Sequence, residues 1–528
     1  MLFTSYSFIA FIFCVFLLYY IVPMRFQWCL LLIASLGFYA IADLRYLLFV
    51  AVTAVTAYFT CLKMDSLNLE QQDFLKAHKS EMTIDAKKQY KESMKKRKRV
   101  WLLVGLLVNL GILCVTKYTN FVIDSINSFL SDASQLKALD LIIPMGISFY
   151  TFQTVSYIVD VYRGTQRAER NFLKLTLFVT FFPQMVQGPI SRFGQLSSTL
   201  YSGHSFNRGK VSLGIGRITW GYFKKVVIAD RLITAVTTLV SQPESYTGTY
   251  VFIAMLFYAF ELYCDFTGGI DITIGIAQTM GITMAENFNL PYFSKNIKEY
   301  WNRWHITMGT WFTDYIFYPI SVCSPMLKIA KWSRAKLGNV IGKRVPVYLS
   351  ALAVWFTTGL WHGAAWNFIV WGLMNFVVIM ISQELEPLYN KFHKKCPWYT
   401  KAPYTVFQIV RTILLMSCIR MFDCYRNVPL TFKMIGTMFA EINLSVFTDG
   451  SLLQLGIGLH DYMVLIAGFI VVLTVSLIKV RVGSVRMLIF KHSYFLYDLC
   501  IAMLTVIILV FGAYGVGYDS SQFIYNQF

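Results

Sequence analysis

Residues 345–383 read VPVYLSALAVWFTTGLWHGAAWNFIVWGLMNFVVIMISQ, which is 39 consecutive positions without an Asp, Glu, Lys or Arg. A helix needs about 20 apolar residues to cross the hydrocarbon of a bilayer, so this stretch has room for nearly two crossings. In its middle lies His362, between small residues and tryptophans. The stretch therefore predicts membrane helices with a polar group held between them.

The apolar character extends over the whole chain. Hydrophobic residues make up 56% of the 528 positions and charged residues 14%, against roughly 25% charged in an average soluble domain. Apolar runs of spanning length recur from end to end and are continuous rather than alternating, which is typical of helices and not of a β-barrel. We predict an all-α polytopic membrane protein with about 11–12 transmembrane helices, forming a single membrane domain over residues 1–528.

The formal charge of +19 follows from a basic excess that lies largely in loops. Residues 76–99 carry ten Lys or Arg and three acidic residues, which predicts a basic cytoplasmic loop facing anionic lipid rather than a nucleic-acid partner. Three apolar segments precede this loop, so we expect the N-terminus outside. No Lys or Arg occurs before Arg25, so the start lacks the basic region of a cleaved signal peptide.

Several familiar chemistries have no motif in this chain. The ten cysteines include no CxxC pair and no cluster with zinc spacing, so we expect no metal site. The chain also lacks GxxxxGK[ST], GxSxG and HExxH. Pumps and hydrolases of those designs are therefore unsupported.

Two histidines are candidates for chemistry. An imidazole can exchange a proton near neutral pH, and His362 sits among small residues that permit close backbone approach. From its position alone His362 could be a general base or a hydrogen-bonding partner of a neighbouring helix. His305 follows Trp301, Asn302, Arg303 and Trp304 in an aromatic and charged segment. That segment predicts a helix at the membrane interface, which could serve only as an anchor.

Three carboxylates interrupt the apolar stretch that begins near residue 251. They are Glu261, Asp265 and Asp271, and the first two share a helical face because they are four residues apart. Intramembrane carboxylates could form the cation site of a transporter. We favour a structural ion pair, with Arg303 or Arg192 as the partner, because no ladder of further carboxylates continues across the membrane.

Seven blocks of the sequence together resemble the membrane-bound O-acyltransferase family, in the family's order. The resemblance covers roughly residues 1–380, is nearest to the alginate O-acetylation branch and extends more remotely to the teichoic-acid D-alanyl transferases. It implies a bundle of helices, including re-entrant or interfacial ones, around a central tunnel. The blocks are Pro144–Gln153, Asp160–Gly164, Phe181–Ile190, Tyr263–Gly268, Glu286–Tyr292, Trp301–His305 and Leu360–Trp366.

The resemblance implies roles for individual residues. His362 matches the family's catalytic histidine, and His305 matches a second essential histidine near the same tunnel. Residues beside them become candidates for positioning or for lining the tunnel: Asn302, Arg303, Trp304, Trp361 and Asp265. Around Arg420 the sequence matches the family only loosely, so no role is carried over to that residue.

The C-terminal tail, residues 523–528 (FIYNQF), resembles a terminal motif of bacterial envelope-acylation systems. In that resemblance Tyr525 carries the acyl group from the membrane enzyme to an extracellular transferase, which would place the C-terminus outside and make the number of spans even. The alternative is an aromatic tail at the membrane interface.

These observations predict an acyltransferase of a bacterial plasma membrane. It would move an acyl group, acetyl in our first choice, from a cytoplasmic thioester to an extracytoplasmic or cell-envelope polysaccharide. The donor would be acetyl-CoA or an acyl-carrier protein, with no bound cofactor, and an extracytoplasmic SGNH-like or similar acetyltransferase would complete the transfer. The alternatives are D-alanyl transfer to teichoic acid and a transporter that uses Glu261, Asp265 and Asp271.

Overall fold

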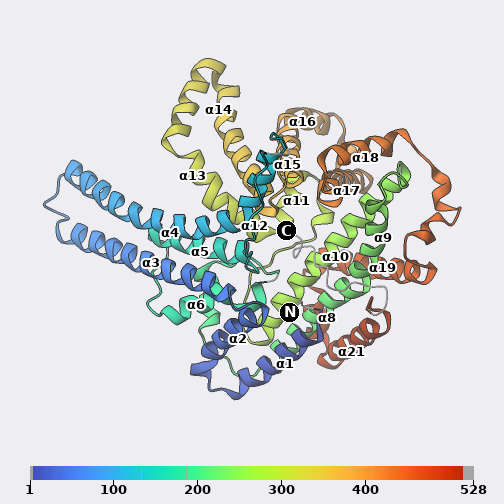
Figure 1. Ribbon diagram of the computed structural model, residues 1–528, viewed down its shortest axis with the longest axis horizontal. Coiled ribbons are helices and arrows are strands. Elements are labelled where there is room, and N and C mark those ends of the chain that lie inside the picture. Colours follow the sequence, from blue (N-terminus) through green and yellow to red (C-terminus); the bar gives the residue numbers. More distant parts are fainter. Residues whose placement is uncertain (1–3, 132–133, 186, 515–528) are drawn as a thin grey trace. The chain divides into compact units, whose positions relative to one another are not determined.

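The computed structural model describes residues 4–131, 134–185 and 187–514, which form helices and connecting turns with no β-strand among them (Figure 1). The chain divides into two compact units, Met1–Val211 with Ile276–Met284 and Ser212–Gly275 with Ala285–Phe528. The prediction of an all-α protein is confirmed.

Eight helices in the described part of the chain are long and apolar enough to cross a membrane, and three shorter apolar helices accompany them. The sequence predicted about 11–12 transmembrane helices, and eight helices of the described residues are long enough to span, so the chain is a multi-pass membrane protein. The eight are Met24–Ala42, Tyr46–Ala77, Ile84–Asn127, Thr249–Thr279, Trp366–Glu384, Ala402–Tyr425, Leu459–Val482 and Tyr494–Phe511. The three shorter ones are Tyr6–Ile21, Phe172–Gln184 and Val428–Ala440.

The first unit is built around a long helical hairpin. Helices α3 and α4 lie side by side, and α5 packs against both of them (Figure 1). A Cβ atom at Gly105 of α4 would lie 3.2–3.3 Å from side-chain atoms of Thr60 and Ile158, so a small residue lets the three helices meet. The helices of this unit are α1 (Tyr6–Ile21), α2 (Gln27–Ala42), α3 (Tyr46–Ala77), α4 (Ile84–Asn127), α5 (Ile147–Arg163), α6 (Phe172–Thr180) and α7 (Phe193–Leu200).

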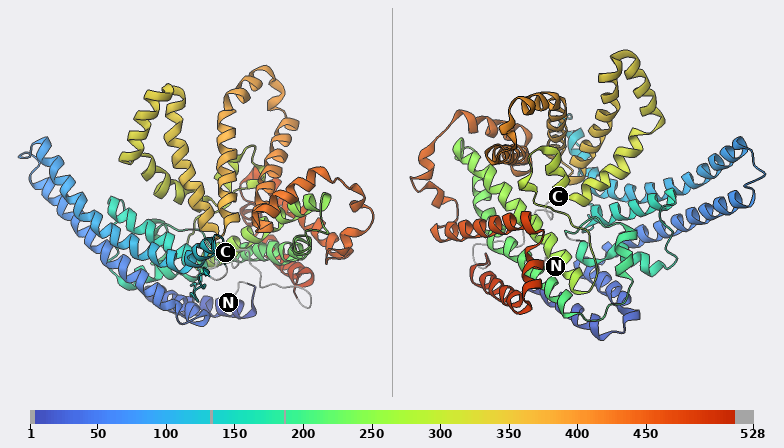
Figure 2. Two further views of the ribbon diagram at one scale, coloured as in Figure 1. Left: turned by 45° about the horizontal axis from the view of Figure 1, so that its top comes forward. Right: turned by 180° about the vertical axis from the view of Figure 1, so that it is seen from behind.

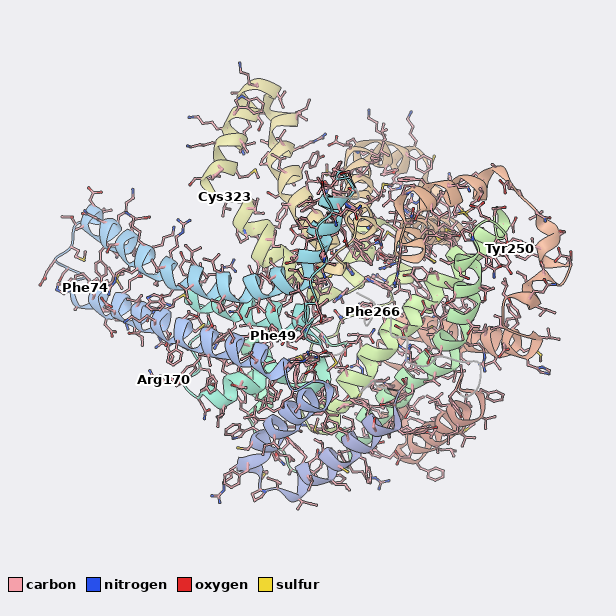
Figure 3. All side chains as sticks on the ribbon, in the orientation of Figure 1. Phe49, Phe74, Arg170, Tyr250, Phe266 and Cys323 are labelled. Carbon is pink, nitrogen blue, oxygen red and sulfur yellow. The ribbon has the colours of Figure 1, made fainter. Side chains whose placement is uncertain are left out.

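The basic stretch 76–99 is mostly helical, where the sequence analysis expected a loop. Helix α4 begins at Ile84, and the hydroxyl of Thr83 caps it by accepting a hydrogen bond from the Ala86 amide at 3.2 Å. Phe74 of α3 stacks on Tyr90 of α4 at a centroid distance of 4.2 Å, near the tip of the hairpin (Figure 3). Lys, Arg, Glu and Gln favour helix, so the charged residues extend the hairpin instead of ending it.

The second unit holds the candidate functional residues. Its core is formed by α9, α10, α17, α18 and α19, with Ile228, Cys264 and Leu455 fully buried. Two π-helical turns, Phe223–Ala229 and Thr313–Phe317, interrupt the α-helices. The remaining helices are α8 (Arg208–Tyr222), α9 (Asp230–Ser241), α10 (Thr249–Thr279), α11 (Ile297–Arg303), α12 (Ile306–Phe312), α13 (Tyr318–Ser321), α14 (Ser324–His362), α15 (Trp366–Glu384), α16 (Glu386–Lys395), α17 (Ala402–Tyr425), α18 (Val428–Ala440), α19 (Leu459–Val482), α20 (Val485–His492) and α21 (Tyr494–Phe511).

Helix α14 consists of two helical segments that fold back on each other at Gly338 (Figure 2). Gly338 has φ 75° and ψ 173°, a conformation that is essentially restricted to glycine. The Ser333 hydroxyl donates to the Gly342 carbonyl at 2.8 Å across the fold. The uncharged stretch 345–383 therefore forms the second segment of α14 and nearly all of α15, with His362 at the end of the first of these helices.

Glycines let α14 and α15 pack backbone to backbone. A Cβ atom at Gly359 would lie 2.4 Å from the Phe368 carbonyl oxygen, and one at Gly372 would lie 2.4 Å from the Trp355 carbonyl oxygen. Contacts this short force the two helices apart when a side chain is present. The close approach expected at Gly359 from the sequence is therefore found, and it brings the end of α14 against α15.

Gly359→Ala is expected to destabilise the protein by about 1–3 kcal/mol, because the new methyl group overpacks this crossing. The measurement is the thermal unfolding of the full chain in detergent. Gly436→Ala is the matched control, since a Cβ atom at Gly436 of α18 meets no atom within 4 Å. Equal unfolding temperatures for the two variants would contradict the close contact.

Candidate functional site

His362 is the last residue of α14. The helix ends there because Gly363 adopts an extended backbone, φ −172° and ψ 151°. The half-buried imidazole lies edge-on to two indoles, with its ring centre 5.0 Å from that of Trp361 and 4.7 Å from that of Trp371. These two indoles come from the end of α14 and from α15.

His305 occupies the turn between α11 and α12 and is fully buried. Its left-handed backbone, φ 48°, costs a non-glycine residue roughly 1–2 kcal/mol, so the surroundings must hold the turn in place. Asn287 supplies that support. Its carbonyl accepts from the Ile306 amide at 2.9 Å, and its side-chain oxygen accepts from the amide and hydroxyl of Thr307 at 3.1 and 2.9 Å.

The same Asn287 side chain selects the tautomer of His305. The amide oxygen lies 3.3 Å from Nδ1 of the imidazole. Because an amide oxygen only accepts hydrogen bonds, Nδ1 carries the proton and Nε2 holds the lone pair of the neutral ring. Burial lowers the pKa of His305, and the nearby Arg420 lowers it further. The ring is therefore neutral at neutral pH.

Both histidines contact one tryptophan. The His305 ring centre lies 5.8 Å from that of Trp361, and the His362 ring centre lies 5.0 Å from that of the same indole. Phe266 of α10 approaches His305 edge-on at 4.9 Å and lies within the second unit (Figure 3). We call His305, Trp361, His362 and Trp371 the histidine cluster. It brings together two sequence blocks that are separated by more than fifty residues.

Arg420 of α17 also reaches this cluster, although sequence reasoning gave it no role. Its buried guanidinium lies 4.4 Å from the ring centre of Trp304 and 5.8 Å from that of Trp371. Asp423, one turn away, lies 3.4 Å from the guanidinium. Stacking on indoles suits arginine because the planar cation is attracted to the ring faces. Arg420 could have been found from the sequence, because a charged residue inside an apolar helix is a functional candidate by default.

The predicted positioning residues divide into two groups. Trp361 belongs to the histidine cluster, and Trp304 lies under Arg420. Asn302 is exposed, and Arg303 forms an ion pair at 2.6 Å with Glu299 on its own helix, α11. The structure therefore places Trp361 in the histidine cluster and Trp304 next to Arg420. It shows no contact of Asn302 or Arg303 with the members of the cluster.

Asp265 lies in a buried ion pair with a partner that the sequence analysis did not choose. Lys225 lies 2.5 Å from Asp265 and 2.7 Å from Asp230, with all three side chains almost completely buried. The π-helical turn Phe223–Ala229 after α8 presents Lys225 to α10, so this lysine joins the candidates that the sequence suggested. Glu261 is also fully buried, one helical turn from Asp265.

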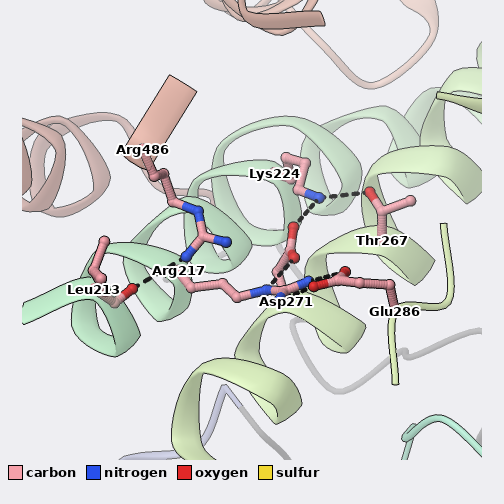
Figure 4. Close-up of polar contacts among 7 residues, drawn as sticks. All are labelled: Leu213, Arg217, Lys224, Thr267, Asp271, Glu286 and Arg486. Atoms are coloured by element: carbon pink, nitrogen blue, oxygen red, sulfur yellow. Dashed lines mark hydrogen bonds and ion pairs between the residues drawn. The ribbon is translucent and has the colours of Figure 1, made fainter. Parts of the chain in front are cut away.

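Asp271 is held by cations as well, in the arrangement of Figure 4. Arg217 Nε and Lys224 Nζ each lie 2.8 Å from its carboxylate. Arg217 also donates two hydrogen bonds of 2.6 Å to Glu286, and Lys224 donates one of 2.7 Å to the Thr267 hydroxyl. Asp265 and Asp271 are thus both paired with cations, which favours structural ion pairs over the cation pathway of a transporter.

A glycine contact between α8 and α10 makes these ion pairs possible. A Cβ atom at Gly221 would lie 2.6 Å from the Gly268 carbonyl oxygen, so the two backbones approach closely. Arg217 and Lys224 flank Gly221 at the spacing of one helical turn. The short distance between the helices therefore brings both cations within reach of the carboxylate on α10.

Comparison with known proteins identifies the family. Residues 165–333 match MBOAT, the membrane-bound O-acyltransferase family. The chain is 32% identical over 447 residues to the probable alginate O-acetylase of Pseudomonas syringae pv. tomato, and the alignment covers 83% of this chain and 75% of that protein. The chain belongs to the membrane-bound O-acyltransferase family. The resemblance inferred from the seven sequence blocks is confirmed.

Two further relatives show how the family likeness is distributed. The peptidoglycan O-acetyltransferase of Helicobacter pylori is 30% identical, with 70% of this chain and 66% of that protein aligned. The teichoic acid D-alanyltransferase of Bacillus subtilis is 28% identical over 54% of this chain and 68% of its own length. This member of the membrane-bound O-acyltransferase family is an acyltransferase, and its likeness to O-acetylating relatives covers more of the chain.

Within this O-acyltransferase, the segment matched to the family contains His305 and its support Asn287, and it ends before His362. Both histidines were candidates from the sequence alone. Asn287 was not, although it lies in one of the quoted blocks. The candidate relay Tyr525 lies outside the described residues.

Proposed function

We propose that this acyltransferase moves an acetyl group from a cytoplasmic thioester across the membrane, for O-acetylation of an extracytoplasmic or cell-envelope polysaccharide. The observation that carries the proposal is the histidine cluster, in which the imidazoles of His305 and His362 contact one tryptophan inside a membrane protein. The likeness to O-acetylating relatives supports acetyl as the group.

In the proposed reaction His362 acts as the general base. Its imidazole accepts the proton of an attacking hydroxyl, the oxygen forms a bond to the thioester carbonyl carbon, and the carbon–sulfur bond breaks to release a thiolate. The proton on His362 then passes to the thiolate. Trp361 and Trp371 flank the imidazole, and such aromatic walls exclude water that would hydrolyse the thioester.

His305 would act beside His362 as a neutral group. Its Nδ1 proton is engaged by Asn287, so the ring keeps one orientation against Trp361. That orientation supports the indole that both histidines contact. We assign His305 a role next to the reacting atoms, and we assign Arg420 no step in this reaction.

Tyr525 would accept the acetyl group first. Its phenol loses the proton to His362 and becomes an ester as the thiolate leaves. An extracytoplasmic SGNH-like or similar acetyltransferase then takes the acetyl group and releases the phenolate, which is a good leaving group because a phenol has a pKa near 10. This route places both termini outside a bacterial plasma membrane. The donor would be acetyl-CoA or an acyl-carrier protein thioester.

The test uses membranes that contain the full chain and three labelled donors, acetyl-CoA, an acetyl-carrier-protein thioester and a D-alanyl carrier-protein thioester. We expect mass spectrometry to find acetyl on Tyr525 in the wild type and none at this position in Tyr525→Phe. Label from the D-alanyl donor alone would replace the proposal with D-alanyl transfer, the function in the name of the Bacillus subtilis relative. No transfer from any of the three donors would refute a thioester source.

A further inference from the structure

A cavity of about 80 Å³ lies beside the ion pairs of Asp271, lined by residues of α8, α10, α19 and the segment after α10. Its lining includes five charged residues, Arg217, Lys224, Asp271, Glu286 and Lys479. It also includes apolar and aromatic residues, among them Trp220, Tyr263, Phe288 and Val472. The cavity is therefore amphipathic and is separate from the histidine cluster.

The charges around this cavity do not balance. Arg217 and Lys224 are paired with Asp271 and Glu286 at 2.6–2.8 Å (Figure 4). Lys479 and Arg486 interact electrostatically with the same two carboxylates, and Arg486 also donates to the Leu213 carbonyl at 3.1 Å. Four cations thus share two carboxylates, which leaves an excess of two positive charges. Such an excess is costly unless an anion joins the group.

The position of the cavity along α19 suits a ligand from the polar edge of the membrane. Lys479 lies in the last turn of α19, a helix long enough to span the membrane. The end of a spanning helix lies near the polar headgroup layer. The Glu286 side chain is 61% exposed, so the charged lining of the cavity has access to solvent. Lys224 comes from a π-helical turn, a feature that occurs often at functional sites.

We propose that this cavity binds the phosphate group of an amphiphilic ligand. A phosphate supplies the negative charge that balances the cation excess, and Lys479, which lines the cavity, donates a charge-assisted hydrogen bond to its oxygens. The apolar lining contacts the organic part attached to the phosphate. Two sources share this chemistry, a phospholipid headgroup and a phosphate of coenzyme A. The proposed binding involves no acyl-transfer step, so it can be tested independently of the proposed function.

The experiment measures binding to the purified full chain in detergent, with coenzyme A and phosphatidylglycerol as separate probes. We expect one of the two to bind the wild type, and this result identifies the source of the phosphate. Lys479→Gln should weaken that binding by about tenfold, since a hydrogen bond between charged groups is lost. Lys479→Arg should restore it. Arg481→Gln removes an exposed cation from the same end of α19 and should leave binding unchanged.

Competition in the wild type gives a second readout that needs no variant. Inorganic phosphate at millimolar concentration should displace the bound probe. The proposal is overturned if neither probe binds, if phosphate does not compete, or if Lys479→Gln binds as tightly as the wild type. Equal weakening by Arg481→Gln would show attraction to overall charge and would also overturn it.

Discussion

His362→Ala is expected to lower acetyl transfer by about 10²–10⁴-fold, the usual contribution of a positioned general acid–base group. The imidazole is half-buried at the end of α14, between Trp361 and Trp371. Its removal leaves the glycine contact of α14 with α15 in place, so the chain should still fold. The measurement is the initial rate of label transfer from acetyl-CoA in membranes that contain equal amounts of each variant.

His460→Ala is the matched control for this substitution, because His460 is exposed near the start of α19. Its rate should equal that of the wild type. His362→Gln preserves the size of the side chain without a basic nitrogen and should be as slow as His362→Ala. A rate near that of the wild type in both His362 variants would remove this residue from the mechanism.

Lys225→Met is expected to cost about 3–5 kcal/mol of stability, the effect of removing one partner from a buried ion pair. Lys225 is 1% exposed and is shared by Asp230 and Asp265, at 2.7 and 2.5 Å. With methionine in its place, two buried carboxylates lose their shared cation. The measurement is the unfolding of the full chain in detergent, followed by loss of its helical signal.

Lys433→Met gives the matched control, because it removes a lysine from an exposed ion pair. Lys433 lies 3.0 Å from Glu244, and the two side chains are 54% and 78% exposed. Exposed pairs contribute little to stability, so this variant should unfold almost as the wild type does. Equal losses in the two variants would show that burial does not set the strength of the Lys225 pair.

Much of the fold could be predicted because membrane insertion depends on local composition. Long apolar segments must form helices in the bilayer, since no water is present to bond with the backbone. The residues at 345–383 therefore indicated two helices and a histidine between them without knowledge of any contact. The same reasoning failed for 84–99, where charge indicated a loop and packing against α3 extended the helix.

The candidate site was only partly predictable. His305 and His362 carry their own signal, an ionisable ring in an apolar or aromatic setting. Asn287 gave no such signal, because its role depends on a turn formed eighteen residues later. Arg420 reaches the indoles only because α17 packs beside α11 and α15.

The sequence by itself determined that this protein is a multi-pass helical membrane protein of the O-acyltransferase family, with two histidines as its chemical candidates. Hydrophobicity adds up along a chain and motifs occupy neighbouring positions, so both can be read from the order of residues. Only the tertiary structure decided that one indole contacts both histidines, that Lys225 pairs with Asp265 and that four cations share two carboxylates around a cavity. These pairings depend on which helix faces cross closely, and that is set where glycines such as Gly221 and Gly359 let two backbones meet.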